Sequence, residues 1–210
     1  MAKVKVMKDS DHIEAVIKRT FETLQNVYDS QQEIFNGPKL VDAGSRLLFP
    51  RKRKEITRIS EQELRFVFVE QLNKEIQTGW DVYYSVETPT VGGYVDFSTE
   101  SPKRDDKKGR SGCIDMVIHD STGKRICMIE FKANNPKPSD YAKDFCKLNN
   151  EGIDYGYFLQ IVENYESDTK SNIENKIESY KVQLESSKKN VFHYCYCLKK
   201  KDYLIEKVKV

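Results

Sequence analysis

The chain has 210 residues, of which 38% are hydrophobic and 32% are charged, so it can fill one sizeable hydrophobic core. Its formal net charge of +2 comes from nearly equal numbers of basic and acidic residues and does not by itself indicate a nucleic-acid-binding protein. No apolar stretch approaches the roughly 20 residues of a membrane span, and the start, MAKVKVMKDSDH, lacks the apolar segment of a secretory signal. We therefore expect one cytoplasmic domain over residues 1–210, with no membrane partner.

The first half of the chain contains two amphipathic patterns. Residues 10–35 carry apolar side chains at helical spacing and end before Gly37 and Pro38, which predicts a helix. Residues 38–58 have no period and include the run RKRK, so we expect a basic loop there. A second helix is predicted from Ser60 to about Gln77, because Ser60 followed by Glu63 fits a capping box.

The middle of the chain has the composition of strands. Aromatic and β-branched residues from 80 onward predict a strand that Pro89 closes, and a glycine-rich, then charged connection follows it. Residues 113–119 and 125–133 are two further apolar runs, and the segment between them has the composition of a hairpin loop. We expect these two runs to pair as an antiparallel hairpin.

The remainder predicts a short helix near Asp140, a strand over 155–162, a polar helix over 169–189 and a closing hairpin. The order is α-α-β-β-β-α-β-α-β-β. This order predicts an α/β or α+β fold with a central mixed sheet flanked by helices.

The five cysteines are an odd number without a C-x-x-C pair, so neither a disulfide framework nor a zinc knuckle is indicated. Cys195 and Cys197 would share one face of a strand, where we favour packing over metal ligation.

Three charged residues interrupt the apolar runs of the predicted hairpin. Side chains alternate along a strand, so Glu130 and Lys132 share a face. If the hairpin turns about Thr122 and Gly123, Asp115 stands directly opposite Glu130, with Cβ atoms about 5 Å apart. The same register gathers apolar side chains on the other face, whereas a slip by one residue would place Asp115 among them.

Two carboxylates so close repel each other, and their burial is costly without compensation. A hard divalent cation such as Mg²⁺ or Mn²⁺ resolves this, because it prefers carboxylates, waters and phosphate oxygens as ligands. Lys132 is placed to orient an attacking water or to neutralise charge on a phosphate. This chemistry is phosphodiester hydrolysis. The alternative is a solvated polar patch with an ordinary Glu–Lys pair.

Asp115 followed across a hairpin by Glu130-Phe131-Lys132 resembles the motif of the PD-(D/E)XK nuclease superfamily, which has the restriction endonuclease-like fold. The resemblance covers residues 60–162, where the element order is also similar. No proline precedes Asp115, which departs from the motif. The resemblance implies a Mg²⁺-dependent endonuclease that acts on DNA. Nucleases of this fold often need two sites, which makes a homodimer a candidate assembly.

The resemblance also implies a glutamate from the helix before the first strand. On a helical projection Glu61 falls within the apolar arc and Glu63 and Glu70 fall outside it. Since Glu63 also has a capping role, we predict that Glu61 joins Asp115 and Glu130 as a metal ligand, with Glu63 as the alternative. An ordinary first-turn acid remains an equal reading of Glu61.

Basic residues elsewhere are candidates for contacts with phosphates. They are Arg51, Lys52, Arg53, Lys143 and Lys147. A solvated face is the alternative for each. Glu87 is expected at the end of a strand on the surface, with a place in the site as the alternative.

We therefore predict a metal-dependent nuclease with Asp115, Glu130, Lys132 and Glu61 as catalytic residues. One rival is a catalytically inactive nucleic-acid-binding module of the same fold. The other is a protein-interaction domain that uses the polar helix at 169–189.

Overall fold

The computed structural model describes residues 7–34, 44–53, 56–153, 155–164, 168–184 and 190–210. The chain forms two compact units, which we describe separately. The first comprises residues 1–58 and 62–81, and the second comprises residues 59–61 and 82–210. The expectation of one domain over the whole chain stays a prediction.

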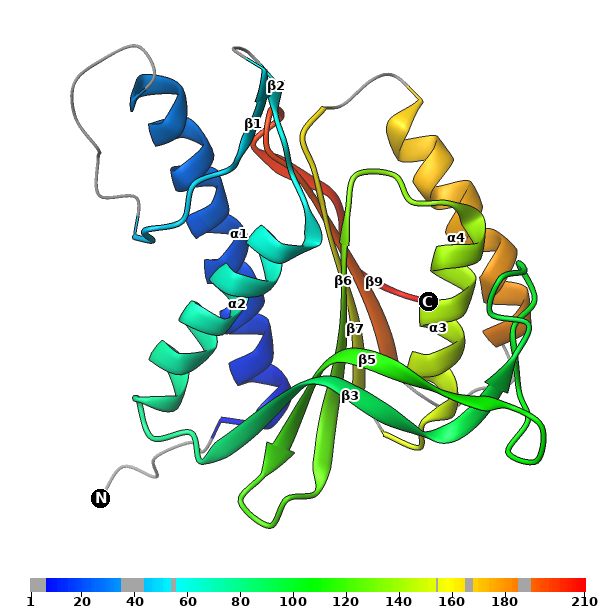
Figure 1. Ribbon diagram of the computed structural model, residues 1–210. Helices are drawn as coiled ribbons and strands as arrows, with labels where there is room; N and C mark the ends of the chain where they lie inside the picture. The colour runs from blue at the N-terminus through cyan, green and yellow to red at the C-terminus, as the bar shows by residue number, and fades with distance from the viewer. Residues whose placement is uncertain (1–6, 35–43, 54–55, 154, 165–167, 185–189) are drawn as a thin grey trace. The chain divides into compact units, whose positions relative to one another are not determined.

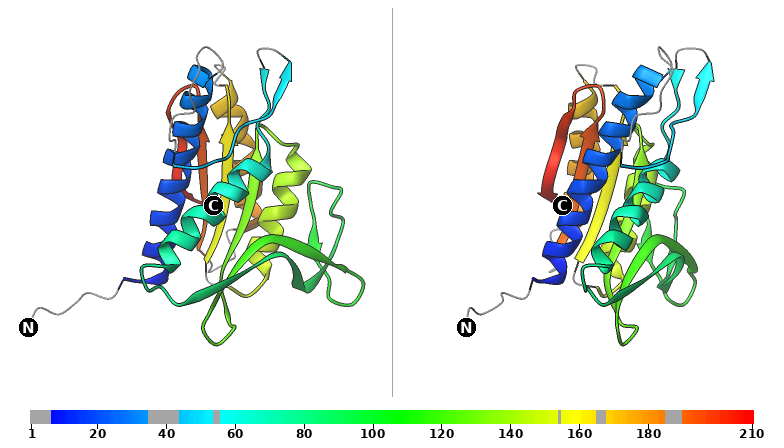
Figure 2. Two further views of the ribbon diagram at one scale, coloured as in Figure 1. Left: turned by 60° about the vertical axis from the view of Figure 1, so that its left-hand side comes forward. Right: turned by 90° about the vertical axis from the view of Figure 1, so that its left-hand side faces the viewer.

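The first unit contains two helices that lie side by side in every view (Figures 1 and 2), α1 (Asp9–Ile34) and α2 (Glu61–Ile76), of which Glu61 belongs to the second unit. Gln71 Nε2 donates a hydrogen bond to Thr23 Oγ1 between the helices, and Arg19 and His12 both contact the carboxylate of Glu75. The two predicted helices are therefore confirmed.

The prediction of a basic loop over residues 38–58 is wrong in part. Arg51–Arg53 (β1) and Ile56–Thr57 (β2) pair as short antiparallel strands. Residues 35–43 and 54–55 lie outside the described residues. Two or three residues are too few for a periodic pattern to show in a sequence, which explains why composition predicted a loop.

The second unit is built on a seven-stranded mixed sheet with the order β4-β3-β5-β6-β7-β8-β9. β6, β7 and β8 run parallel to one another, and the other neighbours are antiparallel. The strands are β3 (Val82–Val95), β4 (Lys103–Arg104), β5 (Arg110–Asp120), β6 (Arg125–Ala133), β7 (Tyr155–Val162), β8 (Asn190–Cys197) and β9 (Asp202–Lys209), and the helices are α3 (Pro138–Asn150) and α4 (Thr169–Leu184). The expected mixed α/β architecture is confirmed at this level.

The strand β3 is longer than the sequence indicated. Pro89 does not close it but pairs with Cys113 of β5, and the strand continues to Val95. Among the described residues, β4 borders β3 at Tyr94 and Val95 and no strand pairs with Pro89 on that side, so its missing N–H removes no bond to a second neighbour there. Part of the expected connection is therefore strand.

The hairpin β5–β6 has the predicted register from Met116 to Ile118 and shifts by one residue between Ile118 and His119, which pairs with Arg125. Met116 pairs with Ile129, and Ile118 pairs with Cys127. At the turn, Asp120 Oδ1 accepts hydrogen bonds from the side chain and backbone of Thr122, and Gly123 adopts φ 82°. This local cap fixes the turn, and the register shift next to it separates the turn from the pairs farther along the hairpin.

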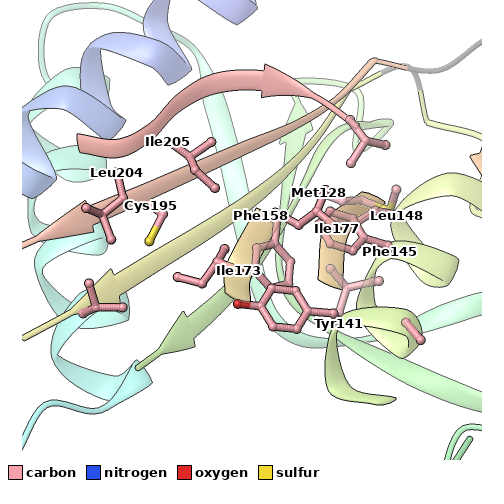
Figure 3. Packing of buried hydrophobic residues seen from close by; sticks show 14 of the residues in the cluster. Met128, Tyr141, Phe145, Leu148, Phe158, Ile173, Ile177, Cys195, Leu204 and Ile205 are labelled. Carbon is pink, nitrogen blue, oxygen red and sulfur yellow. The ribbon is translucent and has the colours of Figure 1, made fainter. Parts of the chain in front are cut away.

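A hydrophobic core joins α3 and α4 to one face of the sheet (Figures 1 and 3). The rings of Tyr141, Phe145 and Phe158 stack on one another within it. α3 begins with Pro138, and the Asp140 carboxylate accepts a hydrogen bond from the backbone N–H of Lys137. The core thus fixes which face of α3 turns toward β6.

Candidate functional site

A pocket of about 330 Å³ opens in the second unit beside the β5–β6 hairpin. The pocket is strongly charged, with five carboxylate and three lysine side chains among its lining residues. Its charged lining residues are Glu61, Glu87, Asp115, Glu130, Lys132, Lys143, Asp144 and Lys147. The four predicted catalytic residues therefore line one cavity.

The confirmed register places Asp115 of β5 beside Glu130 and Phe131 of β6. Asp115 Oδ2 accepts a hydrogen bond of 2.8 Å from the backbone N–H of Phe131. Glu130 is only 1% exposed. A side chain on one strand thus contacts the backbone of the next, which fixes the Asp115 carboxylate at this level of the sheet.

Lys132 is buried between two carboxylates. Its Nζ lies 2.8 Å from Asp144 Oδ2 and 3.5 Å from Glu61 Oε1, and it also donates to the carbonyl oxygen of Phe131. Burial acts to lower the pKa of Lys132, but the charges of Asp144 and Glu61 outweigh burial and raise it. Lys132 therefore stays an ammonium group, which can donate hydrogen bonds and cannot act as a base.

Lys147 has a similar environment on the other side of Asp144. Its Nζ lies 2.6 Å from Glu130 Oε1 and 2.8 Å from Asp144 Oδ1, and it donates a hydrogen bond of 2.7 Å to the carbonyl oxygen of Cys113. Burial opposes its charge, while Glu130 and Asp144 raise its pKa. Asp144 thus bridges two lysines that belong to different elements, β6 and α3.

The two buried carboxylates differ in their affinity for a proton. Burial, followed by the nearby charge of Asp144, raises the pKa of Glu130 well above its ordinary value, despite Lys147. Burial also acts to raise the pKa of Asp144, but Lys147 and Lys132 outweigh burial and lower it. The side chain of Glu130 is therefore the one that most needs a cation to hold its negative charge.

The structure distinguishes the helix glutamates by position. The side chain of Glu61 is 41% exposed, contacts Lys132 and lines the pocket. Burial and then the charges of Asp115 and Asp144 raise the pKa of Glu61, although Lys132 acts against them. Glu63 is buried and is not among the residues that line the pocket. The burial of the two residues is the reverse of the helical projection, which is therefore wrong on this point, whereas the lining of the pocket favours Glu61 over Glu63.

Glu87 lies at the pocket, which was the alternative reading of this residue. It stands between two residues of β3 whose partners, Met116 and Ile114, flank Asp115. The backbone φ of Glu87 is 46°, in the left-handed region, which is uncommon for a residue other than glycine.

The basic residues predicted to contact phosphates have different settings. Lys143 is half-exposed and lines the pocket, with its Nζ 3.9 Å from Asp144 Oδ1. Lys147 is buried, and its ammonium is held by carboxylates. Arg51, Lys52 and Arg53 form β1 of the first unit, and their side chains lie outside the described residues.

Asp144 is the central residue that the sequence prediction missed. It falls on the same helical face as Tyr141, Phe145 and Leu148, all of which are buried. An acidic residue within the apolar arc of a helix is a signal of a paired or functional carboxylate. The sequence also offered a partner for this carboxylate, because Lys147 follows Asp144 by three positions and therefore lies beside it on the helix.

Comparisons with protein-family models, with curated proteins and with solved structures found no match to this chain. The resemblance to the PD-(D/E)XK superfamily thus depends on the residues of the hairpin and their arrangement. Among the described helices, none is both long and apolar enough to cross a membrane.

The pocket fits a hard divalent cation in the kind of donor it offers, because Glu61, Asp115 and Glu130 all present carboxylate oxygens to it. The cation positions beside Glu130 and Asp144 are, however, taken by Lys147 and Lys132. In the part of the chain that the structure describes, no three His, Cys, Asp or Glu side chains stand close enough together to hold a metal.

Proposed function

We propose that the chain is a metal-dependent nuclease that hydrolyses phosphodiester bonds, with DNA as its substrate. The observation that carries this proposal is the register of the β5–β6 hairpin. It brings Asp115, Glu130 and Lys132 to one pocket, where Glu61 joins them from the start of α2. This set of residue types matches the motif of the PD-(D/E)XK superfamily.

Each residue has a distinct role in the proposal. Asp115, Glu130 and Glu61 would hold Mg²⁺ or Mn²⁺. Such an ion supplies Lewis acidity, which lowers the pKa of a water and neutralises charge on a phosphate. Lys132 is held as a charged donor between two carboxylates, so it can orient the attacking water or contact a phosphate oxygen. Lys143, half-exposed at the same pocket, can contact the DNA backbone.

One observation favours a second candidate, a binding module of nuclease fold without catalytic activity. Lys132 and Lys147 already compensate the charges of Glu130 and Asp144 within the protein. A site that is neutralised in this way can be stable without a metal. This candidate predicts DNA binding that does not depend on Asp115 and no cleavage with any divalent ion.

The test is cleavage of plasmid, single-stranded and branched DNA in Mg²⁺ or Mn²⁺ by the wild type and by D115A and K132A. Each variant should lose activity by about 100-fold or more, because each removes a group that stabilises charge in the transition state. K124A is the matched control, since Lys124 is an exposed lysine of the same hairpin. Wild-type activity in D115A and K132A would contradict the site. DNA binding without cleavage would favour the binding module.

A further inference from the structure

The ammonium group of Lys147 is held by three oxygen atoms in the interior of the second unit. Two are carboxylate oxygens, from Glu130 at 2.6 Å and Asp144 at 2.8 Å, and the third is the carbonyl oxygen of Cys113 at 2.7 Å. Lys147 is only 3% exposed. Carboxylates and a carbonyl are the donors that hard cations prefer, so the ammonium occupies a cation position made of oxygen.

The chain also fixes the path of the Lys147 side chain. A Cβ atom at Gly112 would lie 3.4 Å from Cδ of Lys147 and 3.1 Å from the ring of Phe97. The stem of Lys147 thus passes within van der Waals distance of Gly112, between β5 and α3. Packing of the stem directs the ammonium at Glu130 and limits its freedom to point elsewhere.

The neighbouring lysines do not duplicate this contact. Lys132 is held by Asp144 and Glu61, and Lys143 approaches only Asp144, at 3.9 Å. Among the described residues, the ammonium in direct contact with Glu130 is that of Lys147. Removal of Lys147 would therefore leave Glu130 buried without a cation in contact, while Asp144 would keep Lys132.

We propose that Lys147 is the resident cation of the pocket and that a divalent ion binds to Glu130 by displacing its ammonium group. This inference rests on the proposed metal site. It adds that Lys147 regulates the site, because the ammonium group sets the affinity of the pocket for the metal. A divalent ion and an ammonium on the same buried carboxylate repel each other, because the interior screens charge weakly. Each cation therefore binds at the expense of the other.

The test is calorimetric titration of Mn²⁺ into the wild type, K147M and K143M. Met preserves the length and apolar character of the stem and removes the charge. K147M should bind Mn²⁺ at least about tenfold more tightly than the wild type, since binding no longer displaces a competing cation. K143M is the matched control: it removes a lysine of the same helix and pocket that does not touch Glu130, and its affinity should change by less than about threefold.

The thermal stability of the same proteins gives a second readout. In EDTA, K147M should melt at a lower temperature than the wild type, because Glu130 loses its counter-ion. Mn²⁺ should raise the melting temperature of K147M by more than it raises that of the wild type, because tighter binding to the folded state stabilises that state more. If K147M fails to fold without metal, K147Q, which retains a polar end, is titrated in its place.

The outcomes separate this inference from the proposed function. DNA cleavage by the wild type together with a K147M affinity that equals or falls below that of K143M would overturn the role of Lys147 and leave the nuclease intact. Tight Mn²⁺ binding by K147M with no DNA cleavage by the wild type would support the role of Lys147 and count against the nuclease. A complete lack of Mn²⁺ binding in K147M and K147Q would overturn the inference.

Discussion

Two buried glutamates of the second unit are compensated in opposite ways. Glu151, which follows α3, accepts hydrogen bonds from the backbone N–H groups of Val91 and Gly92 and from the hydroxyl of Tyr94, at 2.6 to 3.0 Å. Glu151 also lies 3.7 Å from Nη1 of Arg125, which is longer than a hydrogen bond, whereas Glu130 on β6 is contacted by the ammonium group of Lys147 at 2.6 Å. Both carboxylates are almost fully buried, with side chains 0% and 1% exposed.

The groups that contact a buried carboxylate distinguish one that only stabilises the fold from one that can exchange its partner. The donors to Glu151 are mostly backbone groups of β3 that cannot leave without breaking the strand. The donor to Glu130 is the end of a long side chain, and another cation can take its place. Glu151 therefore joins β3 to the end of α3, whereas Glu130 is available for binding.

We expect the largest change in stability from Glu151→Gln. The amide keeps one oxygen and directs its NH₂ group at one of the two backbone N–H donors, so at least one buried hydrogen bond is replaced by a repulsive contact. We expect E151Q to reduce the free energy of unfolding by about 3 kcal/mol, as measured by urea denaturation. Glu130→Gln, the matched control, should cost only about 1 kcal/mol, since Lys147 keeps Asp144 as a partner. Equal losses in the two variants would break the distinction.

A smaller effect is expected from His193, a buried group that is kept neutral. Burial lowers the pKa of His193 from 6.5 to about 3, and its Nε2 contacts Gln160 Oε1 at 3.0 Å. Below pH 6.5 the unfolded chain takes up a proton that the folded chain refuses, so stability falls as the pH drops toward 3. The wild type should lose about 2 kcal/mol from this group between pH 7 and pH 5.

The measurement is urea denaturation at pH 7 and pH 5 for the wild type and His193→Gln. H193Q should lose less stability over this interval, because its side chain does not titrate. His119→Gln is the matched control, since His119 lies on β5 and is half-buried. An unchanged pH dependence in H193Q would show that His193 does not carry the effect.

Much of the second unit could be predicted from the sequence because its strands are long and their apolar residues regular. The hairpin register was predicted from the alternation of side chains and from a turn about Thr122 and Gly123, and it predicted that Asp115 and Glu130 lie together. The pairing agrees up to Ile118 and shifts by one residue beside the turn. Helical projection placed Glu61 within the apolar arc and Glu63 outside it, but the structure buries Glu63 and leaves the Glu61 side chain 41% exposed. A regular period thus predicted neighbours across the hairpin and did not predict the burial of residues in the first turn of a helix, where the end of the helix is hard to place from sequence.

Contacts between elements far apart in the sequence could not be predicted in this way. Lys143 and Lys147 were predicted to face a phosphate, but the position of the Lys147 ammonium depends on how α3 docks on β5 and β6. The bond from Val91 to Glu151 spans 60 positions and depends on β3 continuing past Pro89. The period of a single helix or strand carries no information about how elements dock on one another. The position of Asp144 within an apolar arc did indicate a paired carboxylate, without identifying its partners.

The most direct test of the central claim is the cleavage of supercoiled plasmid in Mg²⁺ by E130Q and E151Q, after circular dichroism has verified that both are folded. We expect E151Q to cut within about threefold of the wild-type rate and E130Q to lose about 100-fold or more, because E130Q lacks a ligand for the metal. Wild-type cleavage by folded E130Q would contradict the claim that the pocket at Glu130 is the site of phosphodiester hydrolysis.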